Sequence, residues 1–182
     1  MLVAITGTPG TGKTSVSNEI RKNGFKVLDL NNIACEKNFV IEKDHIRNSN
    51  IVDIDKLNKY IKKNYSLKEI VFIEGHLSHL LKSVDKVVVL RCKPEKLKKN
   101  LLSKGWNKNK IKENVEAEIL DIILCETVEI HLNENIFEIN TSNISVIEIS
   151  QIILKLIKNK FKNNKKYKIG NINWSEEILK DF

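Results

Sequence analysis

The chain has 182 residues, of which 41% are hydrophobic and 30% charged, with a formal net charge of +8. Its length suits one domain, no apolar run approaches the roughly 20 residues that cross a bilayer, and no signal peptide is visible, so we expect a single cytoplasmic domain. Three widely spaced cysteines, Cys35, Cys92 and Cys125, fit neither a disulfide framework nor a zinc site, and the basic charge suits anionic partners such as nucleotides or RNA.

The first predicted strand, Leu2 to Thr6, leads directly into a glycine-rich turn. Residues 7–14 read GTPGTGKT, which is the spacing of a phosphate-binding loop. In such a loop backbone N–H groups surround phosphate oxygens, the lysine (here Lys13) supplies charge to the β and γ phosphates, and the threonine (Thr14) offers a hydroxyl to Mg²⁺. The helix predicted from Lys13 to Asn23 adds the positive end of its dipole. The pattern therefore predicts nucleotide binding at this loop.

Apolar runs and helical patterns alternate along the rest of the chain, as in a parallel sheet with crossover helices. Further strands are predicted at Lys26–Leu30, Ile70–Glu74, Lys86–Arg91 and Ile136–Asn140. Further helices are predicted at Asp55–Asn64, Glu95–Ser103, Lys108–Leu132 and Val146–Phe161. The predicted fold class is α/β: a three-layer P-loop NTPase sandwich, with a five-stranded parallel sheet flanked by helices.

An acidic residue ends the strand predicted at 70–74. In P-loop enzymes a second strand beside the first ends in a carboxylate that helps to hold Mg²⁺, usually through water, and Glu74 has this position. A lone glutamate at a strand end is more often simply solvated, but the phosphate loop favours the metal role. His76 follows closely enough to orient a water or contact a phosphate; a structural histidine is an equal alternative.

The segment Ser103-Lys104-Gly105-Trp106-Asn107 predicts a helix end, a glycine and a new helix. Phosphoryl-transfer enzymes close a mobile cationic flap over the nucleotide, and Lys104 beside a glycine hinge suits such a flap. A glycine C-cap with a solvated lysine explains the same residues. Spacing alone favours the C-cap.

The chain resembles an archaeal-type member of the adenylate kinase isoenzyme 6 family. The resemblance is carried, in order, by residues 7–14 (GTPGTGKT), Glu74-Gly75-His76, Lys104-Gly105-Trp106 and residues 114–119 (NVEAEI), and it spans residues 1–161. Members are small nucleoside monophosphate kinases, also active as ATPases and associated with maturation of the small ribosomal subunit. The resemblance implies a kinase domain at 1–162, with a monophosphate-binding region at 31–54 and a lid at 103–113. A basic extension at 163–182 follows it.

The resemblance also implies the site and its ligands. Mg-ATP would bind on Gly10, Gly12, Lys13, Thr14, Ser15 and Lys104. Catalysis would rest on Lys13, Glu74, His76 and Lys104. Mg²⁺ would be held by Thr14 and by Glu74, directly or through water. The phosphate acceptor would be AMP or another nucleoside monophosphate, and a small-subunit ribosomal protein and rRNA would be partners.

Several positions depart from the family pattern. Lys104 stands where members usually carry an arginine that contacts ATP, so the charge is kept but the planar bidentate contact is not. Cys35 replaces an arginine and Asn32 replaces an acidic residue. Of the three arginines in the chain, Arg47 lies in the expected monophosphate region and Arg91 ends a predicted strand, where it could face phosphate. We therefore expect the ATP-binding half of the site to be intact, whereas Cys35 and Asn32 alter the half that would bind the monophosphate.

A nucleotide switch is the main alternative to a kinase. In that interpretation ATP hydrolysis drives release of a ribosomal protein or rRNA, with little monophosphate kinase activity. The lysine-rich end of the chain favours it, because lysine contacts with phosphate give nucleic-acid affinity, although a solvated helix end explains the same residues. These lysines are Lys155, Lys158, Lys160, Lys162, Lys165, Lys166 and Lys168. A kinase for another small molecule, such as shikimate or cytidylate, would share the loop and the sheet.

The last residues predict a short helix behind a tryptophan. Trp174 is followed by Ser175 as an N-cap, with Ile178 and Leu179 apolar. We expect this segment to dock on the domain or on a partner.

Overall fold

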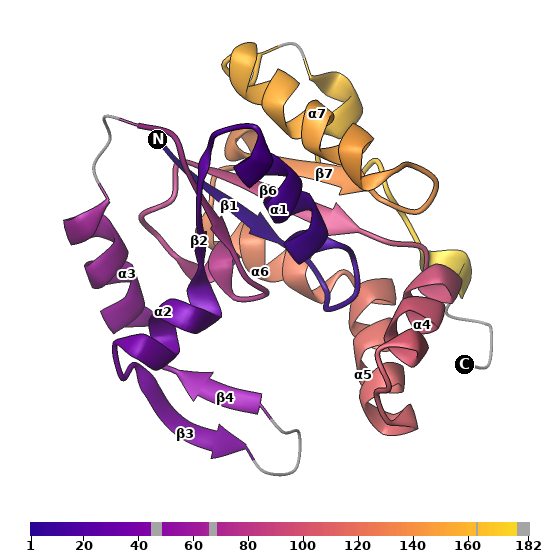
Figure 1. The fold of residues 1–182 in the computed structure, drawn as a ribbon. Helices are drawn as coiled ribbons and strands as arrows, with labels where there is room; N and C mark the ends of the chain where they lie inside the picture. Colours follow the sequence, from indigo (N-terminus) through magenta and orange to yellow (C-terminus); the bar gives the residue numbers. More distant parts are fainter. Residues whose placement is uncertain (45–48, 66–68, 163, 178–182) are drawn as a thin grey trace.

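A five-stranded parallel sheet forms the centre of the computed structural model, which describes residues 1–44, 49–65, 69–162 and 164–177 (Figure 1). Its strands lie in the order β2-β5-β1-β6-β7. Their bounds are β1 Leu2–Thr6, β2 Lys26–Asp29, β5 Val71–Glu74, β6 Lys86–Arg91 and β7 Ile136–Asn140. β1 lies in the middle and pairs in parallel with β5 on one side and β6 on the other. The predicted α/β fold class is confirmed.

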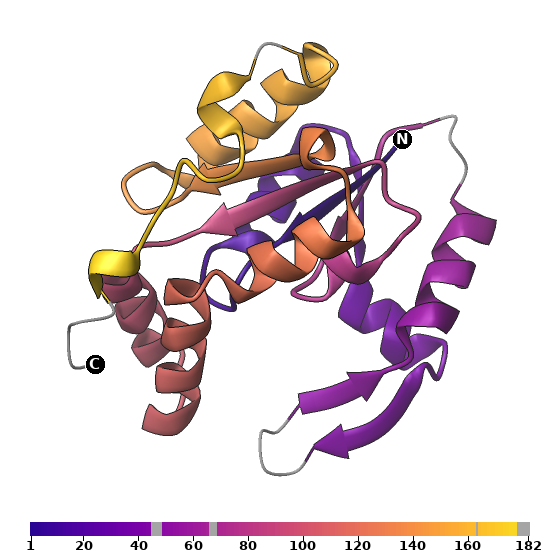
Figure 2. The ribbon, with the colours of Figure 1, turned by 180° about the vertical axis from the view of Figure 1, so that it is seen from behind.

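Helices cover both faces of this sheet (Figures 1 and 2). One face packs against α1 and α7, and the other against α2, α3 and α6. Their bounds are α1 Lys13–Lys22, α2 Leu30–Glu36, α3 Ile54–Asn64, α6 Ile122–Ile130 and α7 Val146–Lys158. Because successive side chains of a strand point to opposite faces, β1 supplies Leu2 and Ala4 to one core and Val3 and Ile5 to the other.

Two further substructures extend from the sheet. α4 (Pro94–Ser103) and α5 (Lys108–Ile119) pack together around a small apolar core of their own. β3 (Val40–Asp44) and β4 (Ser49–Val52) pair in an antiparallel two-stranded sheet. Figures 1 and 2 both show these two substructures projecting from the same side of the central sheet.

Side-chain caps explain where several helices begin. Ser145 and Glu148 form a complete capping box at the start of α7. Asp53 accepts from the backbone N–H of Lys56 at α3, and Asn107 does the same for Lys110 at α5.

The helix predicted over Lys108–Leu132 is in fact two helices. α5 ends at Ile119 and α6 begins at Ile122, after Asp121 with a φ of 55°. A left-handed residue cannot continue an α-helix, so the chain turns here although no glycine or proline marks the place. The other predicted strands and helices are present, with ends that differ by at most three residues. The prediction lacked α2 and the β3-β4 hairpin.

The C-terminal segment docks on the domain. It contains two short 3₁₀ helices, η3 (Lys165–Tyr167) and η4 (Ser175–Glu177). The backbone N–H of Gly170 donates to Glu138 Oε2 (2.6 Å), and Trp174 Nε1 donates to Glu118 Oε1 (3.3 Å). Ile178 and Leu179 lie outside the described residues. Within the described ranges no helix is both long and apolar enough to span a bilayer.

Candidate active site

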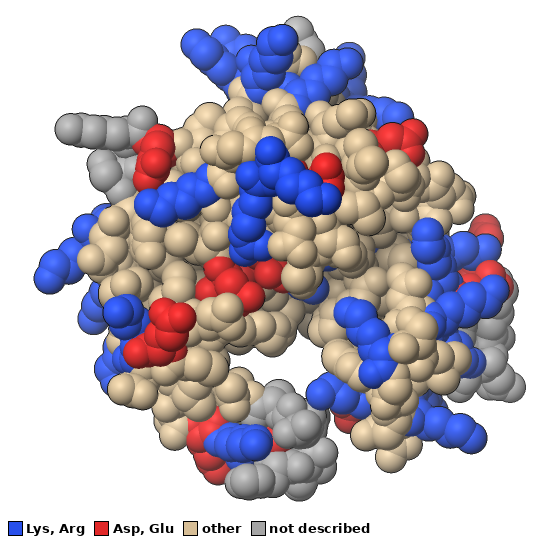
Figure 3. All heavy atoms as spheres, viewed as in Figure 1, with Lys and Arg blue, Asp and Glu red and all other residues tan. Residues whose placement is uncertain are grey.

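A cavity of about 800 Å³ opens at the carboxyl ends of β1 and β5. Its floor is the phosphate loop, residues 7–14; one wall comes from α2 and the β3-β4 hairpin, and the other from the corner between α4 and α5. Figure 3 shows the hollow between the two walls. Open parallel sheets bind ligands at this edge. Every predicted site residue lines the cavity: Gly10, Gly12, Lys13, Thr14, Ser15, Glu74, His76 and Lys104.

Lys13 opens α1, and its side chain lies under the loop. Its Nζ donates to the carbonyl oxygens of Gly7 (2.7 Å) and Thr8 (3.1 Å). Burial lowers the pKa of Lys13 from 10.5 to about 8, and the carboxylates of Glu74 and Glu118 partly oppose that effect. Near pH 7 the group is therefore still a cation, held where the loop amides would meet a phosphate.

Thr14 and Glu74 come together as predicted. Thr14 Oγ1 donates to Glu74 Oε1 over 3.2 Å, linking the first turn of α1 to the end of β5. Asp29 ends the neighbouring strand β2 in register with Glu74. Burial, and next the Asp29 carboxylate, raise the pKa of Glu74, so a cation beside it would be favoured.

These oxygens fit Mg²⁺. The ion takes hard oxygen ligands, keeps several waters and commonly binds through one or two carboxylates plus substrate phosphates. Among the described residues no group of three or more His, Cys, Asp or Glu side chains could hold a metal by itself. The donor set therefore suits an ion that arrives with a nucleotide.

His76 also lines the cavity, half-buried after the end of β5. Burial is the main cause that lowers the pKa of His76 to about 4, and the nearby Lys13 adds to it. The imidazole is therefore neutral near pH 7 and can accept one hydrogen bond while it donates another. Its backbone is held from the sheet, because Thr6 Oγ1 donates to the His76 carbonyl oxygen (3.2 Å).

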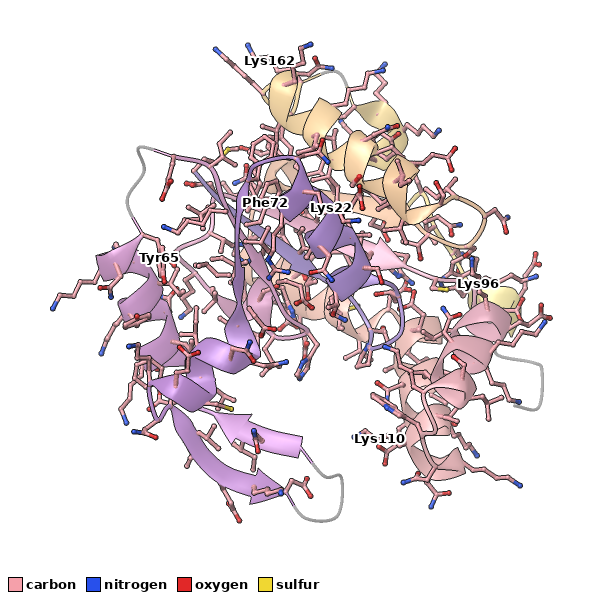
Figure 4. All side chains as sticks on the ribbon, viewed as in Figure 1. Lys22, Tyr65, Phe72, Lys96, Lys110 and Lys162 are labelled. Atoms are coloured by element: carbon pink, nitrogen blue, oxygen red, sulfur yellow. The ribbon has the colours of Figure 1, made fainter. Side chains whose placement is uncertain are left out.

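The segment from Lys104 to Asn107 is a Schellman corner. Gly105 has a φ of 73°, its N–H donates to Leu102 O (2.9 Å), and the N–H of Trp106 donates to Leu101 O (3.4 Å). The predicted C-cap is thus present, and Lys104, although exposed, also lines the cavity. Lys110 Nζ lies 4.5 Å from the centroid of the Trp106 ring, and Figure 4 shows Lys110 on α5. This wall therefore presents cations and an aromatic ring together.

The opposite wall comes from α2 and the β3-β4 hairpin. Asn31 from α2 and Lys43 and Asn50 from the hairpin line it. The exposed thiol of Cys35 lies beside this wall, where it accepts a long contact from Asn50 Nδ2 (3.8 Å). Arg47 lies outside the described residues.

Arg91 does not face the cavity, so the suggestion that it could contact phosphate is wrong. Its guanidinium is buried among three carboxylates: Nε donates to Glu118 Oε1 (2.8 Å), Nη1 to Glu138 Oε1 (2.7 Å), and Nη2 to Asp121. The carboxyl end of β6 does point to the ligand edge of the sheet, but these carboxylates hold the side chain in the core.

A family model described as "AAA domain" matches residues 3–121. A protein of Methanocaldococcus jannaschii named "Putative adenylate kinase" is 38% identical over 180 residues, which cover 98% of this chain and 96% of that protein. A protein of the same name from Pyrococcus abyssi is 41% identical over 177 residues, covering 97% and 92%. The chain belongs to this adenylate kinase-like family.

Solved structures support the fold of this adenylate kinase-like chain. Shikimate kinase from Acinetobacter baumannii, in complex with shikimate, superposes with a TM-score of 0.62 at 17% identity, covering 89% of this chain and 95% of that one. At that identity the likeness concerns the fold alone. It supports the α/β arrangement of a parallel sheet with helices on both faces.

Some residues at or beside the cavity of this family member escaped the sequence analysis. Asp29, which lies in register with Glu74 but does not line the cavity, was missed, although a carboxylate close to the end of a predicted strand is the signal that identified Glu74. Lys110 was missed because a lysine on a basic helix carries no signal of its own. Asn31 and Lys43 fall within the expected monophosphate-binding region 31–54 but were not singled out, because α2 and the hairpin were not predicted.

Proposed function

We propose that this protein is a nucleoside monophosphate kinase of the adenylate kinase type, which transfers the γ-phosphoryl group of Mg-ATP to AMP or another nucleoside monophosphate. The single observation that carries the proposal is one cavity with a phosphate loop as its floor and two separate walls. At about 800 Å³ the cavity has the volume of a drug-sized ligand site or larger, which suits phosphoryl transfer between two nucleotides. The similarity to archaeal proteins named as adenylate kinases supports it.

The phosphate loop forms the part of the proposed site that binds ATP, the phosphate donor. The N–H groups of the loop and the Lys13 ammonium would bind the β and γ phosphates, and Lys104 would add charge from the α4-α5 corner. Thr14 and Glu74 would hold Mg²⁺, which supplies charge neutralisation at the transferred group when bound. The chemistry needs positioning and fixed charge more than a strong base.

The acceptor half is the wall made by α2 and the hairpin. Lys43 supplies a cation there, with Asn31 and Asn50 as hydrogen-bonding amides. Approach of the segment 103–113 toward this wall would exclude water and bring the acceptor into line with the γ-phosphoryl group. In-line transfer leaves ADP and the phosphorylated acceptor.

ATP hydrolysis is a second candidate activity, and His76 favours it. Its neutral imidazole can accept a hydrogen bond from a water inside the cavity and so orient that water toward phosphate. This activity fits the adenylate kinase isoenzyme 6 type of protein and an ATP-driven role in maturation of the small ribosomal subunit. The exposed lysines at the end of α7 and beyond it would contact rRNA or a ribosomal protein; Figure 3 shows blue side chains there, and Figure 4 labels Lys162 among them.

One assay separates the two activities. The protein is incubated with Mg-ATP and each monophosphate in turn, and formation of diphosphate is compared with release of free phosphate. AMP-dependent formation of ADP without free phosphate supports the kinase. Phosphate release that is independent of AMP supports the switch.

Lys13→Ala tests the site itself. We expect both activities to fall about 100-fold or more, because a fixed cation at the developing charge is lost. Lys22→Ala, on the exposed face of the same helix and paired only with Glu19 in the described contacts, is the control and should retain activity. Retention of most ATP turnover in Lys13→Ala would contradict the proposed site.

A further inference from the structure

Glu118, near the end of α5, is a buried carboxylate that joins four separate parts of the chain. Its Oε1 accepts from Arg91 Nε (2.8 Å), from the backbone N–H of Cys92 (3.0 Å) and from Trp174 Nε1 (3.3 Å). Its Oε2 accepts from Thr8 Oγ1 over 2.5 Å. Only 2% of the residue is exposed, so these partners replace water around the charge.

The Thr8 contact reaches the phosphate loop. Thr8 is the second residue of the loop, and its carbonyl oxygen accepts from Lys13 Nζ (3.1 Å) and from Thr11 Oγ1 (2.9 Å). Thr8 therefore donates its hydroxyl to Glu118 and accepts from Lys13 at its carbonyl oxygen. A short hydrogen bond to an ionised carboxylate is among the stronger polar contacts in a protein.

The Trp174 contact reaches the opposite end of the chain. Figures 1 and 2 both show the C-terminal segment passing from beside α7 across the ends of β6 and β7 to the start of α4. On this path Gly170 N–H donates to Glu138 Oε2 (2.6 Å), and Glu138 Oε1 accepts from Arg91. The segment therefore contacts the cluster of Arg91, Glu118 and Glu138 at two of its carboxylates.

The two oxygens of the Glu118 carboxylate have different partners. Arg91 Nε and the Cys92 N–H both donate to Oε1, so the buried Oε2 depends on the Thr8 hydroxyl for its hydrogen bond. Oε2 thus faces the phosphate loop, while the Trp174 indole N–H donates to Oε1. A displacement of Trp174 changes the hydrogen bonding of the same carboxylate that orients Thr8.

We propose that Glu118 is a positioning residue that fixes the phosphate loop through Thr8, and that the C-terminal segment 169–174 holds Glu118 in place through Trp174. This inference rests on the proposed binding of ATP at the loop. It makes the C-terminal segment part of the nucleotide site, although the segment does not line the cavity.

Binding of mant-ATP, a fluorescent ATP analogue, with Mg²⁺ to the full chain tests the proposal at a temperature well below unfolding. We expect Kd to rise about tenfold in Thr8→Val and in Glu118→Gln, and about threefold in Trp174→Phe, because one hydrogen bond to a charge is lost or weakened in each. One control should keep the wild-type Kd: Glu116→Gln changes an exposed carboxylate on the same helix.

A double-mutant cycle separates positioning from general loosening. If Trp174 acts through Glu118 and Thr8, the effects of the two substitutions are not additive. The double variant Thr8→Val/Trp174→Phe should then bind mant-ATP no more than about twofold more weakly than Thr8→Val alone. Independent structural effects would multiply to about thirtyfold. The free energy of unfolding is measured on each variant in parallel.

Three outcomes would overturn the proposal. They are multiplied effects in the double variant, an unchanged Kd in Glu118→Gln, and lower stability of Trp174→Phe with an unchanged Kd. Failure of the proposed function is recognised separately, because the wild-type protein then does not bind mant-ATP at all.

Discussion

At the scale of a single residue, burial and the proposed function have opposite effects on the charge of Lys13. Its side chain is buried, which disfavours the ammonium, yet the proposed role beside phosphate requires that ammonium. The lowered pKa of about 8 measures this conflict and brings the titration of Lys13 close to physiological pH.

The affinity for ATP should therefore fall above pH 8. The free protein loses the Lys13 proton as pH rises through about 8, and bound phosphate would raise that pKa again, so Kd for Mg-ATP should rise up to about tenfold per pH unit between pH 8 and 9.5. Phosphate groups are fully ionised in this window, since their second pKa is about 6. Fluorescence titrations with mant-ATP at each pH measure the effect.

Lys13→Arg is the matched variant for this prediction. A guanidinium keeps its proton throughout the window, so the affinity, whatever its absolute value, should stay level from pH 7 to 9.5. The same rise in Kd in both proteins would show that another group is responsible.

A single substitution at Glu74 tests the proposed Mg²⁺ site. Glu74→Gln keeps the shape and the contact with Thr14 but removes the charge beside the site. We expect the Mg²⁺ concentration for half-maximal activity to rise about tenfold, as expected when one charged ligand or its water contact is lost. Magnesium titrations of the kinase assay measure it. Glu69→Gln, an exposed carboxylate paired with Lys26 just before β5, should not change the requirement.

The residue scale also shows what sequence can predict of the site. Lys13, Thr14 and Glu74 were predicted because a short motif and a strand end determine where they lie. Arg91 could not be placed in the same way. Its surroundings depend on Glu118 and Glu138, which are 27 and 47 residues away and meet it only in the folded chain.

At the scale of elements, buried strands were predictable because β1, β5, β6 and β7 are almost uniformly apolar runs bounded by polar residues. α2 and the β3-β4 hairpin could not be predicted in this way. α2 has seven residues, too short to show a helical period, and β3 is mostly exposed, so its side chains carry no hydrophobic alternation. The resemblance therefore indicated this wall of the cavity only as the range 31–54, and its helix and hairpin were not predicted.

The junction of β1 with the phosphate loop provides a test at this scale. A Cβ on Gly7 would lie 2.3 Å from the carbonyl oxygen of Leu90 on β6, and Gly7 has a φ of 137°. Gly7→Ala should therefore lower the free energy of unfolding by about 1–3 kcal/mol through crowding, beyond its backbone strain. It should also weaken ATP binding. Urea denaturation and mant-ATP titration measure the two effects.

Gly24→Ala is the control for backbone strain alone. Gly24 also has a positive φ, 85°, but a Cβ there meets nothing within 4 Å. Its substitution should cost about 1–2 kcal/mol and leave ATP binding unchanged. Equal losses of stability in the two variants would show that the approach of Gly7 to β6 is not a tight constraint.

At the scale of the whole molecule, the cluster around Arg91 holds the α4-α5 wall of the cavity and the C-terminal segment to the central sheet. The Arg91 guanidinium joins β6 to Glu118 of the α4-α5 wall and to Glu138 of β7, and Glu138 in turn holds the C-terminal segment through Gly170. Three carboxyl groups surround this single cation. Burial raises the pKa of Glu138 while Arg91 opposes that shift.

Arg91→Leu should therefore destabilise the whole domain. Removing Arg91 leaves buried carboxylates without their counter-charge, which typically costs about 3–5 kcal/mol at pH 7. The pKa of Glu138 then rises further, so the folded variant binds more protons than the unfolded chain and gains stability, relative to wild type, as pH is lowered from 7 to 5. Urea denaturation at both pH values measures the loss of stability.

Arg21→Leu is the control. Arg21 is exposed and donates to Asn18 and to the carbonyl oxygen of Val27, so its substitution should cost about 0.5 kcal/mol or less at either pH. A deficit for Arg91→Leu that does not shrink at pH 5 would show that lost packing, rather than unpaired charge, limits the stability of the cluster.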